Sequence, residues 1–106
     1  SYISEKIRQN DSDGALSLTT LEDIECLALS ADYNGIPCTT YIYACDGMLK
    51  ELFTRDDADV SLKNGKNIME IDTLSMSQID DHLYQFTTID SQGHEGSLIT
   101  SERSVQ

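Results

Sequence analysis

Apolar side chains follow two different periodicities along this chain. Residues 2–10 place Ile3 and Ile7 four positions apart with polar residues between them, which is the spacing of one helix face. From Ala15 onward apolar and polar residues alternate, as they do in half-buried strands. Residues 11–14 separate the two patterns, and Gly14 is a typical helix stop. We expect a short N-terminal helix that is the tail of a longer one, because so short a helix is marginal by itself.

Two dipeptides, Asn34-Gly35 and Asp46-Gly47, each lie between apolar runs and predict two-residue hairpin turns. A type I′ turn needs positive φ at both central positions, which these residues accept. A Gly47→Val change should therefore damage folding, since a β-branched residue resists positive φ. The turns predict the cross-strand pairs Tyr33–Ile36, Ala31–Cys38, Leu29–Thr40, Leu27–Ile42, Cys45–Met48, Ala44–Leu49 and Ile42–Glu51.

These pairs sort the side chains of the predicted three-stranded meander onto two faces, because strand side chains alternate. The more apolar face should pack on the core or on the helix. It holds Leu27, Leu29, Ala31, Cys38, Ile42, Ala44, Leu49 and Phe53. The second face carries Cys26, Ala28, Ser30, Tyr41, Tyr43, Met48, Lys50 and Leu52. Its tyrosine stripe suggests a second core layer or a surface that contacts another subunit.

The rest of the chain predicts a long loop and then further strands. Residues 54–67 are polar, with a small hairpin expected at Asn64-Gly65, and strand-like runs resume at 73–79, 82–89 and 96–102. A helix followed by antiparallel strands predicts an α+β fold, with the short N-terminal helix packed on an antiparallel β-meander. We assign residues 1–14 to the end of the helix and residues 15–106 to the β-rich domain.

The length and the net charge of the chain limit the classes of function that it can have. The chain has 106 residues, enough for one domain. Seven Lys+Arg against nineteen Asp+Glu give a formal net charge of -12, which opposes binding to nucleic acid. This chain contains no run of about 18 apolar residues, which is the length that a membrane-spanning helix needs.

Candidate chemistry is sparse. The chain has an odd number of cysteines, Cys26, Cys38 and Cys45, and no two of them have CxxC spacing. Buried free thiols are therefore the favoured interpretation. His82 and His94 lie in turn-like segments, and an enzyme that pairs Cys45 or Cys26 with one of them is the least favoured hypothesis.

Two acidic clusters are candidate calcium ligands, but neither has the spacing of an EF-hand. They comprise Asp11 and Asp13 in the first cluster and Asp56, Asp57 and Asp59 in the second. A helix-ending turn and a solvated loop explain them better. We therefore expect neither a metal nor another cofactor.

Three segments carry a family resemblance: "YISEKIRQNDSDGALSL" (2–18), "TTYIYACDGMLKELF" (39–53) and "LYQFTTIDSQGHEGSLITSER" (83–103). They resemble an uncharacterised family of pilin-like proteins of Gram-positive bacteria, similar to competence minor pseudopilins and to the J-type minor pseudopilin of type II secretion. In such proteins a long helix, apolar in its first half, leads into a β domain. The resemblance implies a soluble head on the extracytoplasmic face of the cell envelope, held in the membrane only by an N-terminal helix upstream of Ser1.

The resemblance also implies a non-enzymatic structural subunit whose partners are other pilin-like subunits or itself. We expect Ile3 and Ile7 to dock the helix, and Tyr41, Tyr43 and Leu52 to contact a neighbouring subunit. Asn34, Gly35, Asp46 and Gly47 are assigned to turns. The alternative hypothesis is a small extracellular β module that binds a carbohydrate or peptide through the tyrosine-lined face.

Overall fold

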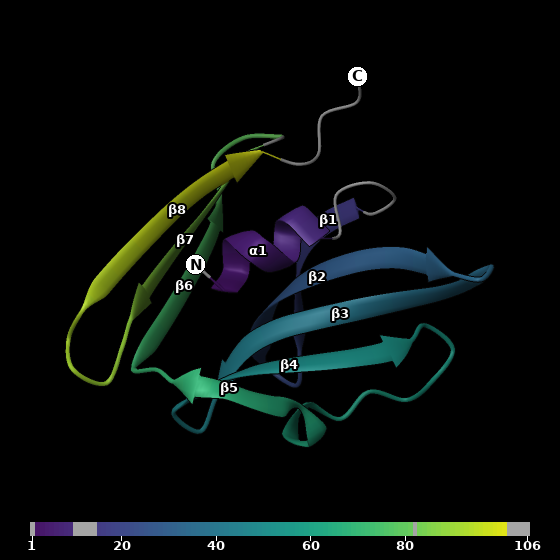
Figure 1. The fold of residues 1–106 in the computed structure, drawn as a ribbon, viewed down its shortest axis with the longest axis horizontal. Coiled ribbons are helices and arrows are strands. Elements are labelled where there is room, and N and C mark those ends of the chain that lie inside the picture. The colour runs from purple at the N-terminus through teal and green to yellow at the C-terminus, as the bar shows by residue number, and fades with distance from the viewer. Residues whose placement is uncertain (1, 10–14, 82, 102–106) are drawn as a thin grey trace.

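The structure, a computed structural model, describes residues 2–9, 15–81 and 83–101 and consists of two antiparallel sheets and one short helix (Figure 1). The helix is α1 (Tyr2–Gln9). The five-stranded sheet has the order β1 (Ala15–Leu21), β2 (Ile24–Tyr33), β3 (Ile36–Cys45), β4 (Met48–Arg55), β5 (Lys66–Glu70). The three-stranded sheet has the order β6 (Thr73–Gln78), β7 (Leu83–Ile89), β8 (Glu95–Ser101).

The predicted fold class is wrong. The structure is a mostly β domain in which two sheets pack on each other, not an α+β fold with one helix on one meander (Figure 1). The reason is the size of the apolar face on the five-stranded sheet. An eight-residue helix is roughly 12 Å long, whereas a ten-residue strand spans roughly 33 Å. The helix cannot cover such a face alone, and β6, β7 and β8 supply the second layer.

The predicted hairpins and their register are confirmed. Every predicted pair between β2 and β3 and between β3 and β4 is present, including Leu27–Ile42 and Ala44–Leu49. Asn34 and Asp46 have φ of 54° each, and the glycines that follow them have φ of 82° and 77°. The dipeptides therefore adopt the positive φ that the hairpin signal requires.

The stretch between β4 and β6 differs from its prediction. Residues 62–64 form a single 3-10 turn, η1 (Leu62–Asn64), and β5 follows as a fifth strand. The hairpin expected at Asn64-Gly65 is absent, because Gly65 has φ of -65° and donates its N–H to the carbonyl of Leu62. The helix expected over 2–10 is present as α1, while its predicted stop at residues 11–14 lies outside the described residues.

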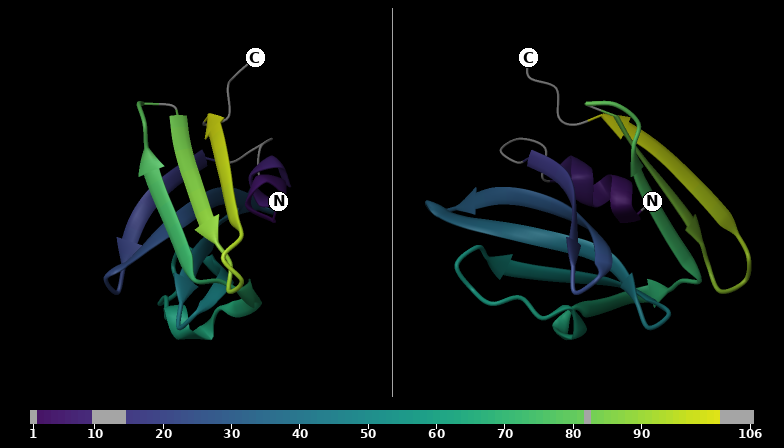
Figure 2. Two further views of the ribbon diagram at one scale, coloured as in Figure 1. Left: turned by 90° about the vertical axis from the view of Figure 1, so that its left-hand side faces the viewer. Right: turned by 180° about the vertical axis from the view of Figure 1, so that it is seen from behind.

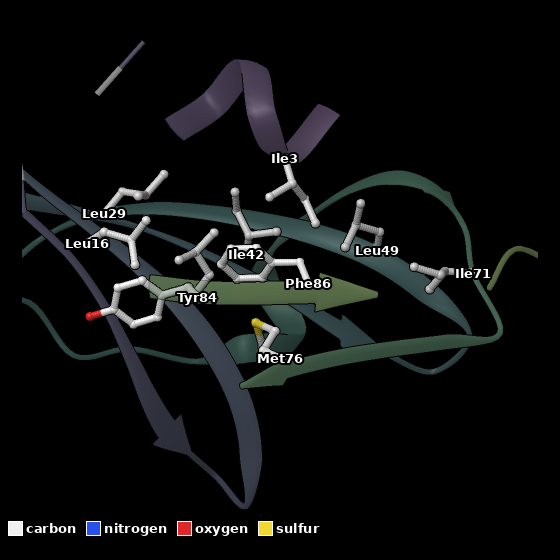
Figure 3. Packing of buried hydrophobic residues seen from close by; sticks show 10 residues of the cluster. Ile3, Leu16, Leu29, Ile42, Leu49, Ile71, Met76, Tyr84 and Phe86 are labelled. Atoms are coloured by element: carbon white, nitrogen blue, oxygen red, sulfur yellow. The ribbon is translucent and has the colours of Figure 1, made fainter. Parts of the chain in front are cut away.

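The main core lies between the two sheets and beneath α1 (Figure 3). The inner faces of the two sheets are the ones that line this core. Figure 3 shows Ile3 reaching down from the helix toward Ile42 and Leu49 of the five-stranded sheet and toward Phe86 of β7. The buried members of this core are Ile3, Leu16, Leu27, Leu29, Ile42, Leu49, Ile71, Met76, Tyr84 and Phe86.

Candidate functional site

Part of the outer face of the five-stranded sheet, around Tyr43, is covered within the domain. Tyr43 is 0% exposed and packs with Cys26 and Leu62 in a second, smaller core. The Tyr43 hydroxyl donates a hydrogen bond to the carbonyl of Leu62, and the Leu62 N–H donates to Glu22 Oε2 at 3.1 Å. These two hydrogen bonds hold η1 against the outer face of the sheet.

One of the residues predicted to contact a neighbouring subunit, Tyr43, is buried inside the domain. Tyr43 is not available to a neighbouring subunit, because η1 and its flanking residues bury it. Tyr41 and Leu52 are half-buried cross-strand neighbours on the same face and pack against the edge of that small core. Tyr41 and Leu52 therefore keep exposed surface, whereas Tyr43 does not.

The cysteines and histidines do not form a reactive pair among the described residues. All three cysteines are free thiols, and burial raises the pKa of Cys26 to about 11, which keeps it protonated near neutral pH. His94 lies in the exposed turn between β7 and β8, with its Nδ1 3.2 Å from Asp90 Oδ2. His82 lies outside the described residues.

Two carboxylates in the acidic loop after β4, Asp56 and Asp57, have hydrogen-bond partners within the domain. Thr39 donates its hydroxyl hydrogen to Asp56 Oδ1 at 2.6 Å. Arg55 donates from Nε and Nη2 to the two carboxylate oxygens of Asp57 at 3.0 and 2.9 Å. Within the described part of the chain, no three His, Cys, Asp or Glu side chains are grouped to hold a metal ion. Asp11 and Asp13 lie outside that part.

The helix is docked on the core and also tied to β4 by polar contacts. Ile3 is buried and Ile7 is half-buried against the main core, as expected for docking residues. One turn apart on the same side of α1, the Tyr2 hydroxyl donates to Glu51, and Lys6 Nζ lies 3.0 Å from Glu51 Oε2. Glu51 belongs to the inner face of the five-stranded sheet, where a lone carboxylate would be costly.

The environment of Glu51 keeps this carboxyl charged. Burial acts to raise its pKa, but hydrogen bonds from Tyr2 and Lys6 and the Lys6 charge outweigh that effect, so the pKa lies below its ordinary value. The pKa of Tyr2 is raised, first by burial and then by the neighbouring carboxylate. The pair is therefore a neutral phenol that donates to a charged carboxylate.

Beyond the helix, part of the inner face of the five-stranded sheet is exposed in the described portion of the chain. The long hairpin of β2 and β3 projects past α1 (Figure 1), and there Tyr33, Ile36 and Phe53 are 54%, 39% and 52% exposed. The Tyr33 and Phe53 rings meet edge to face, with centroids 5.2 Å apart and an interplanar angle of 83°. The sequence pattern had placed Phe53 on the core face, which is correct, but the core does not reach it.

An open groove of about 570 Å³ runs along these side chains. We call it the aromatic groove. Its lining residues are Lys6, Tyr33, Asn34, Ile36, Cys38, Thr40, Glu51, Phe53 and Arg55. The lining combines four apolar or aromatic side chains with five polar or charged ones. Binding surfaces likewise combine apolar contact area with groups that can hydrogen-bond. Sequence reasoning missed this groove because the alternation of side chains assigns them to a face but does not show how far the core extends over that face.

A second, smaller hollow of about 190 Å³ opens between the start of α1, the ends of β4 and β5, and β8. Its apolar lining includes Ile3, Leu49, Ile71, Phe86 and Leu98. These side chains belong to the main core or pack against it, so the hollow opens onto that core.

The chain matches the family described as a domain of unknown function, DUF4860, over residues 1–91. The chain belongs to this family. No curated protein matches the DUF4860 chain, and no solved structure matches it. The one helix among its described residues is too short and too polar to cross a membrane.

Proposed function

We propose that this DUF4860 chain is a non-enzymatic structural subunit that acts by packing against like subunits in an assembly of the cell envelope. One observation carries the proposal: the inner face of the five-stranded sheet extends past its helix and exposes the aromatic groove. Tyrosine and arginine are enriched at the energetic centres of protein interfaces. Tyr33 and Arg55 both line this groove, together with the exposed Ile36 and Phe53.

The docking of α1 supports a pilin-like arrangement for this subunit. Ile3 enters the core, and Tyr2 and Lys6 both hold Glu51, so the helix is fixed against the sheet along its first two turns. In this proposal an apolar segment upstream of Ser1 holds the subunit in the membrane, and the β domain lies on the extracytoplasmic face. The partners are other pilin-like subunits or further copies of this chain.

Photo-crosslinking in the native cell tests the proposal. A photoreactive amino acid replaces Phe53 in the groove, and the control chain carries it at Ser17, an exposed position on β1. The expected result is a Phe53-dependent crosslink to the same chain or to another pilin-like subunit, and no such crosslink from position 17. A groove that crosslinks to no subunit, in cells that produce the protein normally, would contradict the proposal.

The gene upstream of the Ser1 codon tests the envelope location separately. A short basic leader, a processing site and roughly 20 apolar residues, which is a membrane-spanning length, are expected there. An unrelated soluble domain in that position would remove the basis for membrane anchoring.

The aromatic groove also favours a second candidate function, a module that binds a carbohydrate or a peptide. Its volume lies within the range of small-ligand sites. Its exposed rings lie beside the side chains of Asn34 and Arg55, which can hydrogen-bond a ligand. Saturable shifts of groove resonances on titration with an oligosaccharide or peptide, in a chain that does not self-associate, would favour this function over assembly.

A further inference from the structure

The chain has two asparagines that are followed by glycine, in Asn34-Gly35 and Asn64-Gly65. Asparagine is a thermolabile residue, because the backbone nitrogen of the next residue can attack its side-chain amide. A glycine at that next position has no Cβ to obstruct the attack and leaves the backbone free to adopt the required conformation. The sequence alone therefore marks both dipeptides equally, and only their surroundings in the fold can distinguish them.

The first dipeptide, Asn34-Gly35, forms the tip of the β2–β3 hairpin, which projects from the domain (Figure 1). Both residues are exposed, and a Cβ placed on Gly35 would meet no described atom within 4 Å apart from those of its two chain neighbours. The hydrogen bond that closes such a turn joins the flanking residues, Tyr33 and Ile36, and does not use the Gly35 nitrogen. These flanking residues are 54% and 39% exposed, so opening this end of the hairpin uncovers little buried surface and costs little free energy.

The second dipeptide, Asn64-Gly65, lies where η1 covers the small core. Gly65 donates its N–H to the Leu62 carbonyl at 3.3 Å, and the same carbonyl accepts the hydrogen bond from the Tyr43 hydroxyl. Leu62 is 1% exposed. Turning the Gly65 nitrogen toward the Asn64 side chain would break its hydrogen bond and disturb the packing of Tyr43 with Leu62. An attack on Asn64 therefore requires η1 to unfold, whereas an attack on Asn34 requires only the tip of a hairpin to open.

We propose that Asn34 is a site of spontaneous deamidation in the folded protein and that η1 protects Asn64 from the same reaction. The Gly35 nitrogen loses its proton and attacks Asn34 Cγ, so that a new C–N bond forms. The bond between Cγ and Nδ2 breaks, and Nδ2 takes up that proton and leaves as ammonia. Water then opens the resulting cyclic imide at either carbonyl, which leaves an aspartate or an isoaspartate at position 34. The reaction consumes water and releases ammonia, and no oxidant or reductant takes part.

Both products change the aromatic groove, because Asn34 is one of its lining residues. An aspartate adds a negative charge there. An isoaspartate continues the backbone through the side chain and adds one carbon to a two-residue turn whose geometry sets the pairing of Tyr33 with Ile36. The groove is therefore altered irreversibly as the protein ages. This inference goes beyond the proposed assembly function and does not depend on it, since the reaction needs only the exposed turn.

Peptide mapping by tandem mass spectrometry tests the proposal on the 106-residue chain. The folded protein is incubated at mildly alkaline pH, and the mass increase that marks deamidation is followed over time at each asparagine. Deamidation should be at least about tenfold faster at Asn34 than at Asn64, because the rate follows the population of the opened form. In the same chain unfolded in guanidinium chloride, the two rates should be similar, since neither dipeptide is then protected.

A Tyr43→Phe variant tests the source of the protection, because it keeps the ring but removes the hydrogen bond to Leu62. It should raise the rate at Asn64 and leave the rate at Asn34 unchanged. An unchanged rate at Asn64 in this variant would overturn the assignment of the protection to η1. Equal rates at the two asparagines in the folded wild-type chain would overturn the proposal. So would an Asn34 that stays intact in the folded chain while the unfolded chain reacts.

Discussion

The five-stranded sheet buries side chains on both of its faces, whereas the three-stranded sheet buries side chains on only one. In the former, Ile42 packs into the main core and its neighbour Tyr43 packs beneath η1 on the other side. In the latter, Phe86 enters the core and its neighbour Gln85 faces outward among serine and threonine. Because it contributes buried side chains to both hydrophobic cores, the five-stranded sheet is the structural centre. The outer face of the three-stranded sheet is free to serve as a surface.

The largest expected effect is the loss of Tyr43. Tyr43→Ala should lower the free energy of unfolding by about 3–5 kcal/mol, because it empties the small core beneath η1. The matched change on the other sheet, Gln85→Ala, should cost no more than about 0.5 kcal/mol, as expected of an outward-facing polar residue. Urea denaturation measures both. Equal costs would mean that the outer face of the three-stranded sheet is also covered within the domain.

A smaller effect is expected at Gly65, where the backbone passes close to the hydroxyl end of the Tyr43 side chain. A Cβ at this position would collide with the Tyr43 hydroxyl and would lie 3.1 Å from Tyr43 Cζ and 3.3 Å from the Glu51 carbonyl oxygen. Gly65→Ala should therefore destabilise the domain by about 1–3 kcal/mol.

A double-mutant cycle sharpens this prediction. In a Tyr43→Phe background the hydroxyl is gone, and Gly65→Ala should cost measurably less, with a coupling of about 0.5–3 kcal/mol. Purely additive effects would show that Gly65 is required for a reason other than the close approach of Tyr43.

Substitutions in two turns of the five-stranded sheet are expected to change the stability of the domain in opposite directions. Gly47 has φ of 77° between β3 and β4, so Gly47→Val should destabilise by about 1–2 kcal/mol. Asp23 has φ of 65° between β1 and β2, a conformation that an L residue adopts at a cost. Asp23→Gly should therefore cost nothing or stabilise by up to about 1 kcal/mol. Thermal unfolding distinguishes the two, and unchanged stability of Gly47→Val would contradict the observed register.

An effect similar in size to that of Gly47→Val is expected at the attachment of α1. Glu51→Gln should cost about 1–2 kcal/mol near neutral pH, because it removes charge-assisted hydrogen bonds with Tyr2 and Lys6. The folded-state pKa of Glu51 is lowered, so its stabilisation is present above the ordinary carboxyl pKa of about 4.3 and is lost as pH falls through the lower folded value.

The difference in unfolding free energy between wild type and Glu51→Gln should therefore shrink on acidification. Urea denaturation from pH 7 down to pH 3 measures this dependence. A difference that stays constant across this range would show that Glu51 acts through packing and not through its charge.

Local signals in the sequence predict the middle of the fold well. Asn34-Gly35 and Asp46-Gly47 are turn sequences whose backbone demands are specific, so they fix the pairing of three strands without any tertiary information. The turn between β1 and β2 escaped prediction because Glu22 and Asp23 adopt positive φ without a glycine. β5 was not predicted because its sequence, KNIME, lies at a sheet edge, where polar residues replace the alternation of apolar and polar side chains.

Features that depend on distant contacts could not be predicted in the same way. The burial of Tyr43 requires Leu62, which is 19 residues away and lies in a stretch that reads as a polar loop. The separation of β6–β8 into a second sheet depends on how much apolar area the helix leaves uncovered, which no local pattern records. The aromatic groove has the same origin, because Tyr33 and Phe53 follow a core-facing alternation in a region that the core does not reach.

The attachment of α1 through Glu51 has a mechanical consequence. Figure 1 and the right panel of Figure 2 show α1 running in roughly the same direction as β4, the strand that carries Glu51. Because β4 lies between β3 and β5, a pull on the start of the helix would pass through Tyr2 and Lys6 into a strand bonded on both sides. These two side-chain contacts would therefore carry the load before the hydrogen-bonded ladders on either side of β4 did. The Glu51 attachment is thus the first part of the domain that tension along the helix would test.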